Sequence, residues 1–214
     1  MMKEIFNGVF KEGNRIYTIN KIPGKRVYNE KLVKKGGVEY RSWNPYRSKM
    51  AGAILKGLKN FPIKRDTKIL YLGVASGTTA SHFSDIATNG IIYGVEVAFR
   101  PMKNFVKLCQ ERKNMLPILA DANKPESYDA IVEEIDFIYQ DIAQKNQVEI
   151  FLKNMEKFNA KEGMIMVKAR SIDISMPPNK VFDMVKKELR KHFNIKEAIK
   201  LAPYAKDHIA IYVS

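Results

Sequence analysis

Acidic side chains stand at the ends of several apolar runs in this sequence, and a loop of small residues follows the first run. The apolar segment 69–72 leads directly into the loop 73–79. The next three apolar runs end at Glu96, Asp121 and Asp141. Because the carboxyl ends of neighbouring parallel strands meet at one edge of a sheet, we expect the loop and the three acids to line one crevice.

The loop has the composition of a ligand-binding turn. Gly73 and Gly77 permit a close approach of the backbone to a ligand, and the first amides of the following helix are exposed. Thr78 and Thr79 can cap that helix or bond a ligand carboxylate. The sequence contains neither G-x-G-x-x-G nor G-x-x-x-x-G-K-[ST], which disfavours a dinucleotide and a nucleoside triphosphate.

The acids suit an adenosine ligand that carries little negative charge. Glu96 lies 23 residues after Gly73, where an acid bonds ribose hydroxyls, and Asp121 can bond an adenine amino group. No basic partner for a pyrophosphate accompanies them, so S-adenosylmethionine, with its cationic sulfonium and amine, fits the pattern. Taken singly, Glu96 could be an ordinary strand-end acid and Asp121 a turn residue or helix cap. The argument therefore rests on the series.

Composition limits the class of protein. The chain has 214 residues, 45% of them apolar, which is enough for one core with a small appended module. No run of eighteen or more apolar residues predicts a membrane span, and the first residues lack a signal-peptide core. The single cysteine, Cys109, cannot form an internal disulfide or a Cys-based metal site, and no metal is expected. It fits a reducing compartment and should lie buried on a helix.

The charge is large and uneven. The net charge is +14, and residues 1–50 hold 12 basic and 4 acidic side chains, a net +8. Such a field attracts polyanions, of which nucleic acid is the commonest. A basic surface that only keeps the protein soluble is the alternative interpretation.

Basic and aromatic residues alternate near the end of this basic segment. The alternating residues are Tyr40, Arg41, Trp43, Tyr46, Arg47 and Lys49. This mixture suits attraction of phosphates and stacking on bases or sugars. Trp43 could equally be a core residue that joins two modules.

The first part of the chain predicts a small antiparallel module over residues 1–50. Short strand-like segments occur at 7–10, 15–20, 26–30 and 36–43, separated by glycine and proline turns. Helical spacing of apolar residues then begins at Met50, so a second domain is expected over 51–214.

Strand and helix signals alternate from residue 68 onward. Apolar runs predict strands at 68–72, 91–96, 116–120, 135–140, 163–169, 195–201 and 208–213, and helical spacing predicts helices at 78–88, 101–113, 126–133, 146–158 and 178–192. Such alternation is typical of an α/β fold with an open, mostly parallel sheet between helices. Only six residues separate the last two strands, so these should pair as an antiparallel hairpin at the sheet edge.

Several long segments resemble one known family. The segments are EYRSWNPYRSKMAGAI, YLGVASGTTASHFSDI, ILADANKPESY, DFIYQDIAQKNQ, VKARSID and APYAKDHIAIYV, which occur in this order from residue 39 to 213. They resemble the fibrillarin family in its short archaeal form, without a Gly/Arg-rich N-terminal extension. The resemblance implies a Rossmann-like S-adenosylmethionine-dependent methyltransferase fold of seven strands with a C-terminal antiparallel hairpin.

The resemblance also implies an activity, partners and a location. The activity is guide-directed methylation of the ribose 2′-hydroxyl in rRNA, and in archaea also tRNA. The partners are a box C/D guide RNA, a Nop-family scaffold protein and a kink-turn-binding ribosomal-type protein, with no membrane association. The location is the cytoplasm of an archaeal cell.

By position, the resemblance supplies the cofactor-binding residues. They are Thr78, Thr79, Glu96, Val97, Asp121, Ala122, Asp141, Ile142, Ala143 and Gln144. The small-residue loop adds Gly73, Ala75 and Gly77 to the expected cofactor contacts.

The resemblance assigns catalysis to Lys49, Asp141, Lys168 and His208. Methylation of a hydroxyl is an in-line displacement, in which positioning can supply on the order of 7–11 kcal/mol at best. Lys168 ends the apolar segment MIMVK of the strand predicted at 163–169 and would either accept the hydroxyl proton or hold the oxygen in line. A second cation such as Lys49 favours a neutral amine nearby, and Asp141 would orient it. Related enzymes often have glutamate as the fourth residue, so His208 is the member specific to the fibrillarin pattern.

Other functions fit parts of the sequence. A stand-alone methyltransferase for RNA or a small molecule would need no partners, and a non-catalytic RNA-binding assembly module would not bind S-adenosylmethionine. Lys168 and Arg170, with the loop 170–179, are expected to overhang the site and guide the RNA strand.

Overall fold

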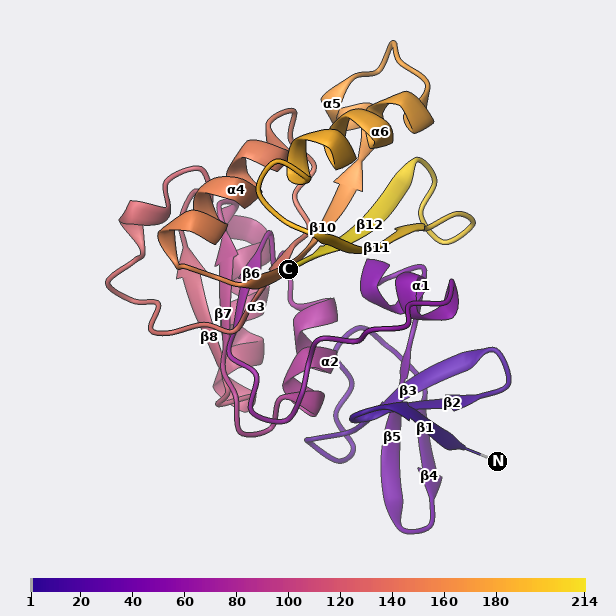
Figure 1. Cartoon of the computed structure of the whole chain (residues 1–214). Coiled ribbons are helices and arrows are strands. Elements are labelled where there is room, and N and C mark those ends of the chain that lie inside the picture. Colours follow the sequence, from indigo (N-terminus) through magenta and orange to yellow (C-terminus); the bar gives the residue numbers. More distant parts are fainter. Residues whose placement is uncertain (1) are drawn as a thin grey trace.

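The computed structural model describes residues 2–214, which form two β-sheets and the helices around them (Figure 1). The first sheet is antiparallel, with the strand order β1-β2-β3-β5-β4. Its strands are β1 (Lys3–Phe6), β2 (Val9–Glu12), β3 (Arg15–Ile19), β4 (Leu32–Lys35) and β5 (Val38–Trp43). The small antiparallel N-terminal sheet predicted from the sequence is confirmed.

One strand of this module is predicted wrongly. Residues 26–30 form turns instead of a strand, and β4 begins after them. The Glu30 carboxylate accepts hydrogen bonds from the backbone amides of Val27 and Tyr28, at 3.0 and 2.8 Å. A side chain that bonds its own backbone in this way competes with a strand ladder. The sequence also does not predict β1.

The second sheet has seven strands in the order β11-β12-β10-β9-β6-β7-β8. Its strands are β6 (Ile69–Leu72), β7 (Ile92–Glu96), β8 (Met115–Leu119), β9 (Phe137–Gln140), β10 (Glu162–Lys168), β11 (Ile195–Lys200) and β12 (His208–Val213). The five strands from β6 to β10 are parallel to one another, and β12 runs antiparallel to both β10 and β11. The expected mostly parallel sheet with a C-terminal antiparallel hairpin is therefore confirmed.

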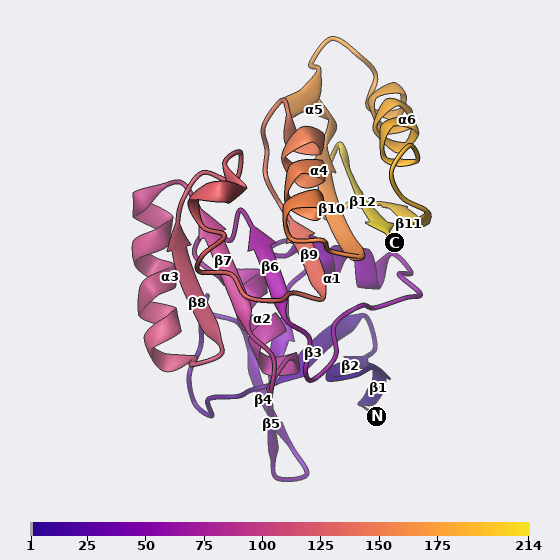
Figure 2. The same cartoon turned by 60° about the vertical axis from the view of Figure 1, so that its left-hand side comes forward.

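Helices cover both faces of this sheet (Figure 2). They are α1 (Lys49–Leu55), α2 (Thr78–Ile86), α3 (Phe99–Glu111), α4 (Gln147–Lys157), α5 (Ala169–Ile172) and α6 (Pro178–Leu189), with the 3-10 turn η1 (Pro125–Ser127). Alternate strand residues face opposite sides, so Ile69 and Tyr71 join the core under α1, α2 and α3. Leu70 and Leu72 join the core under α4 and α6. Cys109 is buried on α3, as predicted.

The helix predicted at 126–133 is wrong. Only η1 is helical there, and turns follow it. Tyr128 and Val132 are nevertheless buried in the core beneath α4. Tyr128 and Val132 are four residues apart, as buried residues of a helix often are, but here they anchor a loop to the core. Hydrophobic periodicity alone does not distinguish these two cases.

Trp43 joins the two sheets. It is 1% exposed, its ring stacks on His82 of α2 at 4.8 Å, and it meets Phe61 and Phe83 edge-on. The core-anchor interpretation of Trp43 is thus confirmed, and it offers no stacking surface to RNA. The division of the chain at residue 50 stays a prediction, since one apolar core runs from Val9 of the small sheet to Met166 of the large one.

A buried ion network lies beside Trp43. We use this name for Glu30, Arg41, Asp85 and Arg112. Arg41 bonds Glu30 at 2.6 Å and Asp85 at 2.7 Å, and Arg112 bonds the other oxygen of Asp85 at 2.6 Å. Arg41 is fully buried, so the prediction that it contacts RNA is wrong.

Candidate active site

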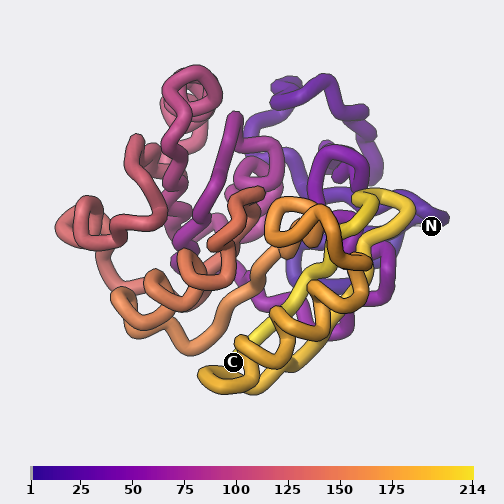
Figure 3. The backbone as a smooth tube through the Cα atoms, turned by 90° about the horizontal axis from the view of Figure 1, so that it is seen from above, coloured from indigo at the N-terminus to yellow at the C-terminus, as the bar shows by residue number. Residues whose placement is uncertain are grey.

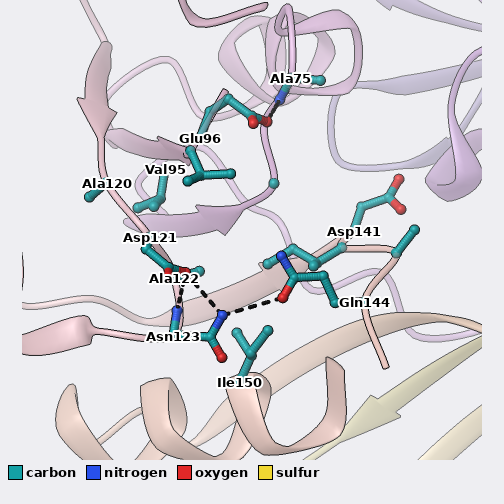
Figure 4. A pocket seen from close by; sticks show the side chains of 14 residues that line it. Ala75, Val95, Glu96, Ala120, Asp121, Ala122, Asn123, Asp141, Gln144 and Ile150 are labelled. Carbon is teal, nitrogen blue, oxygen red and sulfur yellow. Dashed lines mark hydrogen bonds between the residues drawn. The ribbon is translucent and has the colours of Figure 1, made fainter. Parts of the chain in front are cut away.

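A cavity of about 290 Å³ lies at the carboxyl ends of β6, β7, β8 and β9 (Figure 4). Strand order reverses here, because β6 has β7 on one side and β9 on the other. Crevices at such switch points bind ligands in doubly wound sheets. The predicted residues that line it are Gly73, Ala75, Glu96, Val97, Asp121, Ala122, Asp141, Ile142, Ala143 and Gln144.

The cavity wall combines apolar and acidic groups. Val95, Ala120, Asn123 and Ile150 also line it, and the sequence does not single them out. Val95 of β7, Ala120 just after β8 and Ile150 of α4 are apolar, and in the sequence a cavity-facing apolar residue looks like any core residue. The carboxylates of the cavity can accept hydrogen bonds from hydroxyls or amines, and the apolar wall suits a flat ring.

Gly73 and Gly77 are required for different reasons. Gly73 has φ +78°, and a Cβ there would lie 2.6 Å from the carbonyl oxygen of Asp141, so glycine lets the two strand ends meet. Gly77 has φ +86°, and its Cβ would lie 2.6 Å from the Phe105 ring of α3. Packing against α3 therefore explains Gly77. A contact of Gly77 with the cofactor stays a prediction.

The acids at the strand ends are held in place by the backbone. The Glu96 carboxylate accepts the amides of Ala75, at 3.0 Å, and Ala98, at 2.9 Å. Asp121 accepts the backbone amide and the side-chain amide of Asn123, and these bonds lower its pKa. Each carboxylate oxygen has two lone pairs, so both acids keep acceptor capacity toward the cavity.

Thr78 and Thr79 lie outside the cavity. Thr79 is 5% exposed and its hydroxyl donates to Ser48 Oγ at 2.9 Å. Ser48 caps α1, so this bond ties the start of α2 to the start of α1. Roles of both threonines in cofactor binding stay predictions.

Lys49 and Asp141 form an ion pair at the rim of the cavity. The Lys49 ammonium lies 2.7 and 2.9 Å from the two carboxylate oxygens, although 92 residues separate the two in sequence. Lys49 is the first residue of α1, and Asp141 follows β9 directly. The pair is partly open, with side chains 27% and 20% exposed.

Lys168 and His208 complete the group, which we call the edge cluster (Lys49, Asp141, Lys168 and His208). They are directly opposed partners in the antiparallel pair of β10 and β12. β12 also packs against α1, the helix that begins at Lys49. Figure 3 shows the yellow C-terminal hairpin beside the purple N-terminal part of the chain. Within residues 2–214 the Lys168 ammonium has no hydrogen-bond or ion-pair partner.

His208 is held as a neutral ring. Its Nδ1 lies 2.6 Å from the carbonyl oxygen of Lys206, so Nδ1 carries the proton and Nε2 keeps a lone pair. Burial lowers the pKa of His208, the Lys206 carbonyl and Asp141 oppose this, and the charges of Lys49 and Lys168 add to it. All four residues predicted to be catalytic thus lie within electrostatic reach of one another.

Gln147 positions Lys168, and the sequence analysis does not identify it. Gln147 is fully buried in α4; its Oε1 accepts the Lys168 amide at 2.9 Å, and its Nε2 donates to the Lys168 carbonyl at 3.2 Å. We call these two hydrogen bonds the Gln147 clamp. Gln147 is the last residue of the segment DFIYQDIAQKNQ, and neither its type nor its spacing indicates such a contact.

Comparison with known proteins identifies the family. The family model described as Fibrillarin matches residues 1–214. The chain belongs to the fibrillarin family. The resemblance read from the sequence is confirmed.

Relatives and solved structures agree across the chain. A fibrillarin-like rRNA/tRNA 2′-O-methyltransferase of Methanocaldococcus jannaschii is 49% identical, over 97% of this chain and 94% of that protein. A crystal structure of Aeropyrum pernix fibrillarin with natively bound S-adenosyl-L-methionine has a TM-score of 0.87 and 43% identity, covering 96% of this chain and 93% of that one. Fibrillarin in a complex with Nop5p has a TM-score of 0.91 and 46% identity, covering 99% of each chain.

Two absences accompany this fibrillarin site within residues 2–214. The described residues contain no group of three or more His, Cys, Asp or Glu side chains that could hold a metal. None of the helices described there is long and apolar enough to cross a membrane.

Proposed function

We propose that this chain transfers a methyl group from S-adenosylmethionine to the ribose 2′-hydroxyl of rRNA and tRNA, as the catalytic subunit of a guide-RNA particle. The observation that carries the proposal is the edge cluster beside the cavity: an ion-paired lysine and aspartate, a second lysine without a partner, and a neutral histidine. The activity named for relatives that are about 49% identical supports it.

The cavity fits the proposed cofactor. Apolar groups such as Val95 and Ile150 can hold an adenine, and the carboxylates of Glu96 and Asp121 can accept its ribose hydroxyls and amino group. No basic side chain lines the cavity within the described residues, which suits a ligand without phosphates. When bound, S-adenosylmethionine supplies a methyl group already activated by its sulfonium.

The edge cluster handles the 2′-hydroxyl in this proposal. Asp141 fixes the Lys49 ammonium, and Gln147 fixes the backbone of Lys168, which lies opposite His208 in the pair of β10 and β12. The Lys168 ammonium then either holds the hydroxyl oxygen in line or, when neutral, accepts its proton. His208 offers the Nε2 lone pair as a further hydrogen-bond acceptor.

One substitution separates the two roles of Lys168. In the Lys168→Arg variant a guanidinium replaces the amine, and it can hold an oxygen but cannot accept a proton at ordinary pH. The measurement is a single-turnover pH–rate profile. If the variant reacts at the full wild-type rate, Lys168 does not act as the base. If the rate is at least tenfold lower at every pH and RNA binding is unchanged, the result supports Lys168 as the base.

The partners form the finer part of the proposal. The solved complex pairs a fibrillarin with Nop5p, and we infer a Nop-family scaffold partner for this chain. A box C/D guide RNA would choose the target by base pairing, and a kink-turn-binding protein would complete the particle. A cytoplasmic location stays a prediction.

Reconstitution tests the proposal. Purified chain, guide RNA, target RNA, scaffold and kink-turn-binding protein are mixed with labelled methyl donor, and one component is omitted at a time. Label at one guided 2′-hydroxyl that requires every component is the expected result. Label on bare RNA without partners would favour a stand-alone enzyme, and absence of saturable S-adenosylmethionine binding would favour an assembly module.

A further inference from the structure

A second hollow lies behind the loop 73–79, on the side away from the cofactor cavity. It has a volume of about 450 Å³ and lies between the turn 26–29, the start of α2 and the exposed side of α3. Ser76 and Thr78 line it, whereas Gly73 and Ala75 of the same loop line the cofactor cavity. The loop 73–79 therefore separates the two hollows.

Three cations without close partners surround this hollow. Arg26, Arg47 and Lys107 line it from three separate elements. Within the described residues 2–214 their side chains form no hydrogen bond or ion pair, and Arg26 interacts with Glu39 only at longer range. The one acid in the lining, Glu111, is already paired with Lys25 at 3.3 Å. The lining of the hollow thus carries excess positive charge, and no acid among residues 2–214 pairs closely with these three cations.

Neutral donors add to the charge. Ser76, Thr78 and Asn104 also line the hollow, and their side chains have no hydrogen-bond partner within residues 2–214. Hydroxyl and amide donors between cations are the groups that bind phosphate oxygens.

The wall of the hollow is rigid. Glu30 of the buried ion network holds the turn through the amides of Val27 and Tyr28, and is itself held by Arg41. The Tyr28 hydroxyl lies 2.7 Å from Nε2 of His82. The backbone that carries Arg26 is therefore already ordered before a ligand binds, which lowers the entropy cost of binding.

The hollow adjoins the edge cluster. Arg47 lines the hollow, and Lys49, two residues later, is paired with Asp141. Two residues of extended chain span at most about 7 Å. The segment 47–49 therefore links the hollow to the edge cluster, and this is the reason for placing one RNA strand across both.

We propose that this hollow, which we call the phosphate cleft, binds backbone phosphates of the target RNA strand and so places the ribose at the edge cluster. The proposal rests on the proposed function for the RNA substrate. It explains how the chain binds RNA without reading bases, because contacts to phosphates carry no sequence information.

The test variant is Arg26→Ala/Lys107→Ala in the complete particle. Both side chains are exposed and have no partner, so the fold should be unaffected; Arg47 is left intact because it lies so close to Lys49. The matched control is Lys113→Ala/Lys196→Ala, which removes the same charge from two exposed positions near the starts of β8 and β11, the two outer strands of the sheet. Thermal melting confirms that both variants are folded.

The expected result is a change in RNA binding with little change in chemistry. The concentration of target RNA for half-maximal single-turnover rate should rise about tenfold, and the slope of log affinity against log salt should fall by about 1.4–1.8 for two lost contacts. The rate at saturating RNA should stay within about threefold of wild type. The control should match wild type, and Arg26→Lys/Lys107→Arg should retain binding.

A scan of neutral linkages sharpens the test. One methylphosphonate at a time replaces a phosphate of the target strand. At one or two linkages near the methylated ribose, this change should weaken RNA binding by the wild-type particle. It should not weaken binding by the Arg26→Ala/Lys107→Ala particle any further. Three results would overturn the phosphate cleft. The variant and the control could lose RNA affinity equally, or the half-maximal RNA concentration of the variant could stay unchanged. The variant could also react more slowly at saturating RNA while binding RNA normally. Failure of the wild-type particle to methylate RNA instead overturns the proposed function.

Discussion

The buried ion network and the edge cluster are built from the same kinds of side chain, but their charge balance and exposure differ. The network holds two arginines and two acids, and the side chains of Arg41 and Asp85 are 0% exposed. The edge cluster holds two lysines against one acid, and its ion pair is partly open to solvent. Both clusters join segments far apart in sequence.

The difference separates a structural role from a chemical one. Every charge in the network has an opposite charge within hydrogen-bond distance, which makes a buried cluster tolerable. In the edge cluster Lys168 lacks such a partner, so a developing negative charge on an incoming oxygen would complete it. We infer that the charge left over marks the reacting edge.

The largest expected effect is on the network. Asp85→Ala leaves Arg41 and Arg112 buried without their shared acid, and we expect the free energy of unfolding to fall by about 3–5 kcal/mol. Urea unfolding followed by circular dichroism measures this. The matched control is Glu188→Ala, which removes one member of an exposed pair and should change stability by less than about 1 kcal/mol. Equal effects of the two would contradict the comparison.

The opposite pattern is expected at the edge cluster. Lys168→Ala should lower the single-turnover methylation rate by about 10²-fold or more, because the oxygen loses its partner. The stability should change by no more than about 0.5 kcal/mol, since Lys168 supports no other side chain. A variant that melts early and keeps its rate would show that Lys168 is structural.

Gln147→Leu should show an effect of both kinds. Loss of the clamp leaves the amide and carbonyl of Lys168 without partners and should cost about 1–3 kcal/mol of stability. The methylation rate should fall about tenfold while S-adenosylmethionine binding stays normal. Gln147→Glu, which can still accept from the Lys168 amide, should recover part of the rate. No rescue would mean that Gln147 serves packing alone.

The pH dependence of stability should also reveal the network. Burial, and then the charges of Arg41 and Arg112, lower the pKa of His82 well below its usual 6.5. Below pH 6.5 the unfolded chain therefore binds a proton that the folded chain does not, so stability falls as pH falls, by up to about 1.4 kcal/mol per pH unit. Above pH 6.5 His82 is neutral in both states and contributes no slope.

The slope is measured by urea unfolding between pH 5 and 7.5. The Thr18 and Tyr28 hydroxyls bond the two nitrogens of the His82 ring and do not titrate in this window, and Asp85 lies 4.0 Å from Nδ1. His82→Gln should reduce the slope by up to the same amount, whatever its effect on stability itself. An identical slope in the variant would show that His82 is not the group responsible.

The sequence predicted features that follow from the order of strands and helices, but not the contacts that depend on packing between distant segments. Glu96, Asp121 and Asp141 could be placed together because parallel strands bring their carboxyl ends to one edge. The RNA contact predicted for Arg41 is wrong, because Asp85 and Glu30 hold its side chain in the core. The packing of Gly77 against Phe105 could not be predicted either, since the two residues are far apart in sequence.

Other features carry no periodic signal. The Gln147 clamp and the turn at 26–30 depend on single hydrogen bonds between a side chain and the backbone. The phosphate cleft draws its cations from residues 26, 47 and 107. The sequence pointed to Arg47 as a phosphate contact, but Arg26 and Lys107 are ordinary charges in the sequence. Only the arrangement in space distinguishes them from other surface lysines and arginines.

The reversed direction of β12 makes one loop length critical. His208 faces Lys168 because β12 starts, rather than ends, at the reacting edge. Side chains alternate between faces along a strand, so removing one residue from the connection 201–207 would set Ile209 opposite Lys168 and turn the whole strand over. A deletion there would replace an imidazole with an aliphatic group although no residue of the edge cluster had been mutated.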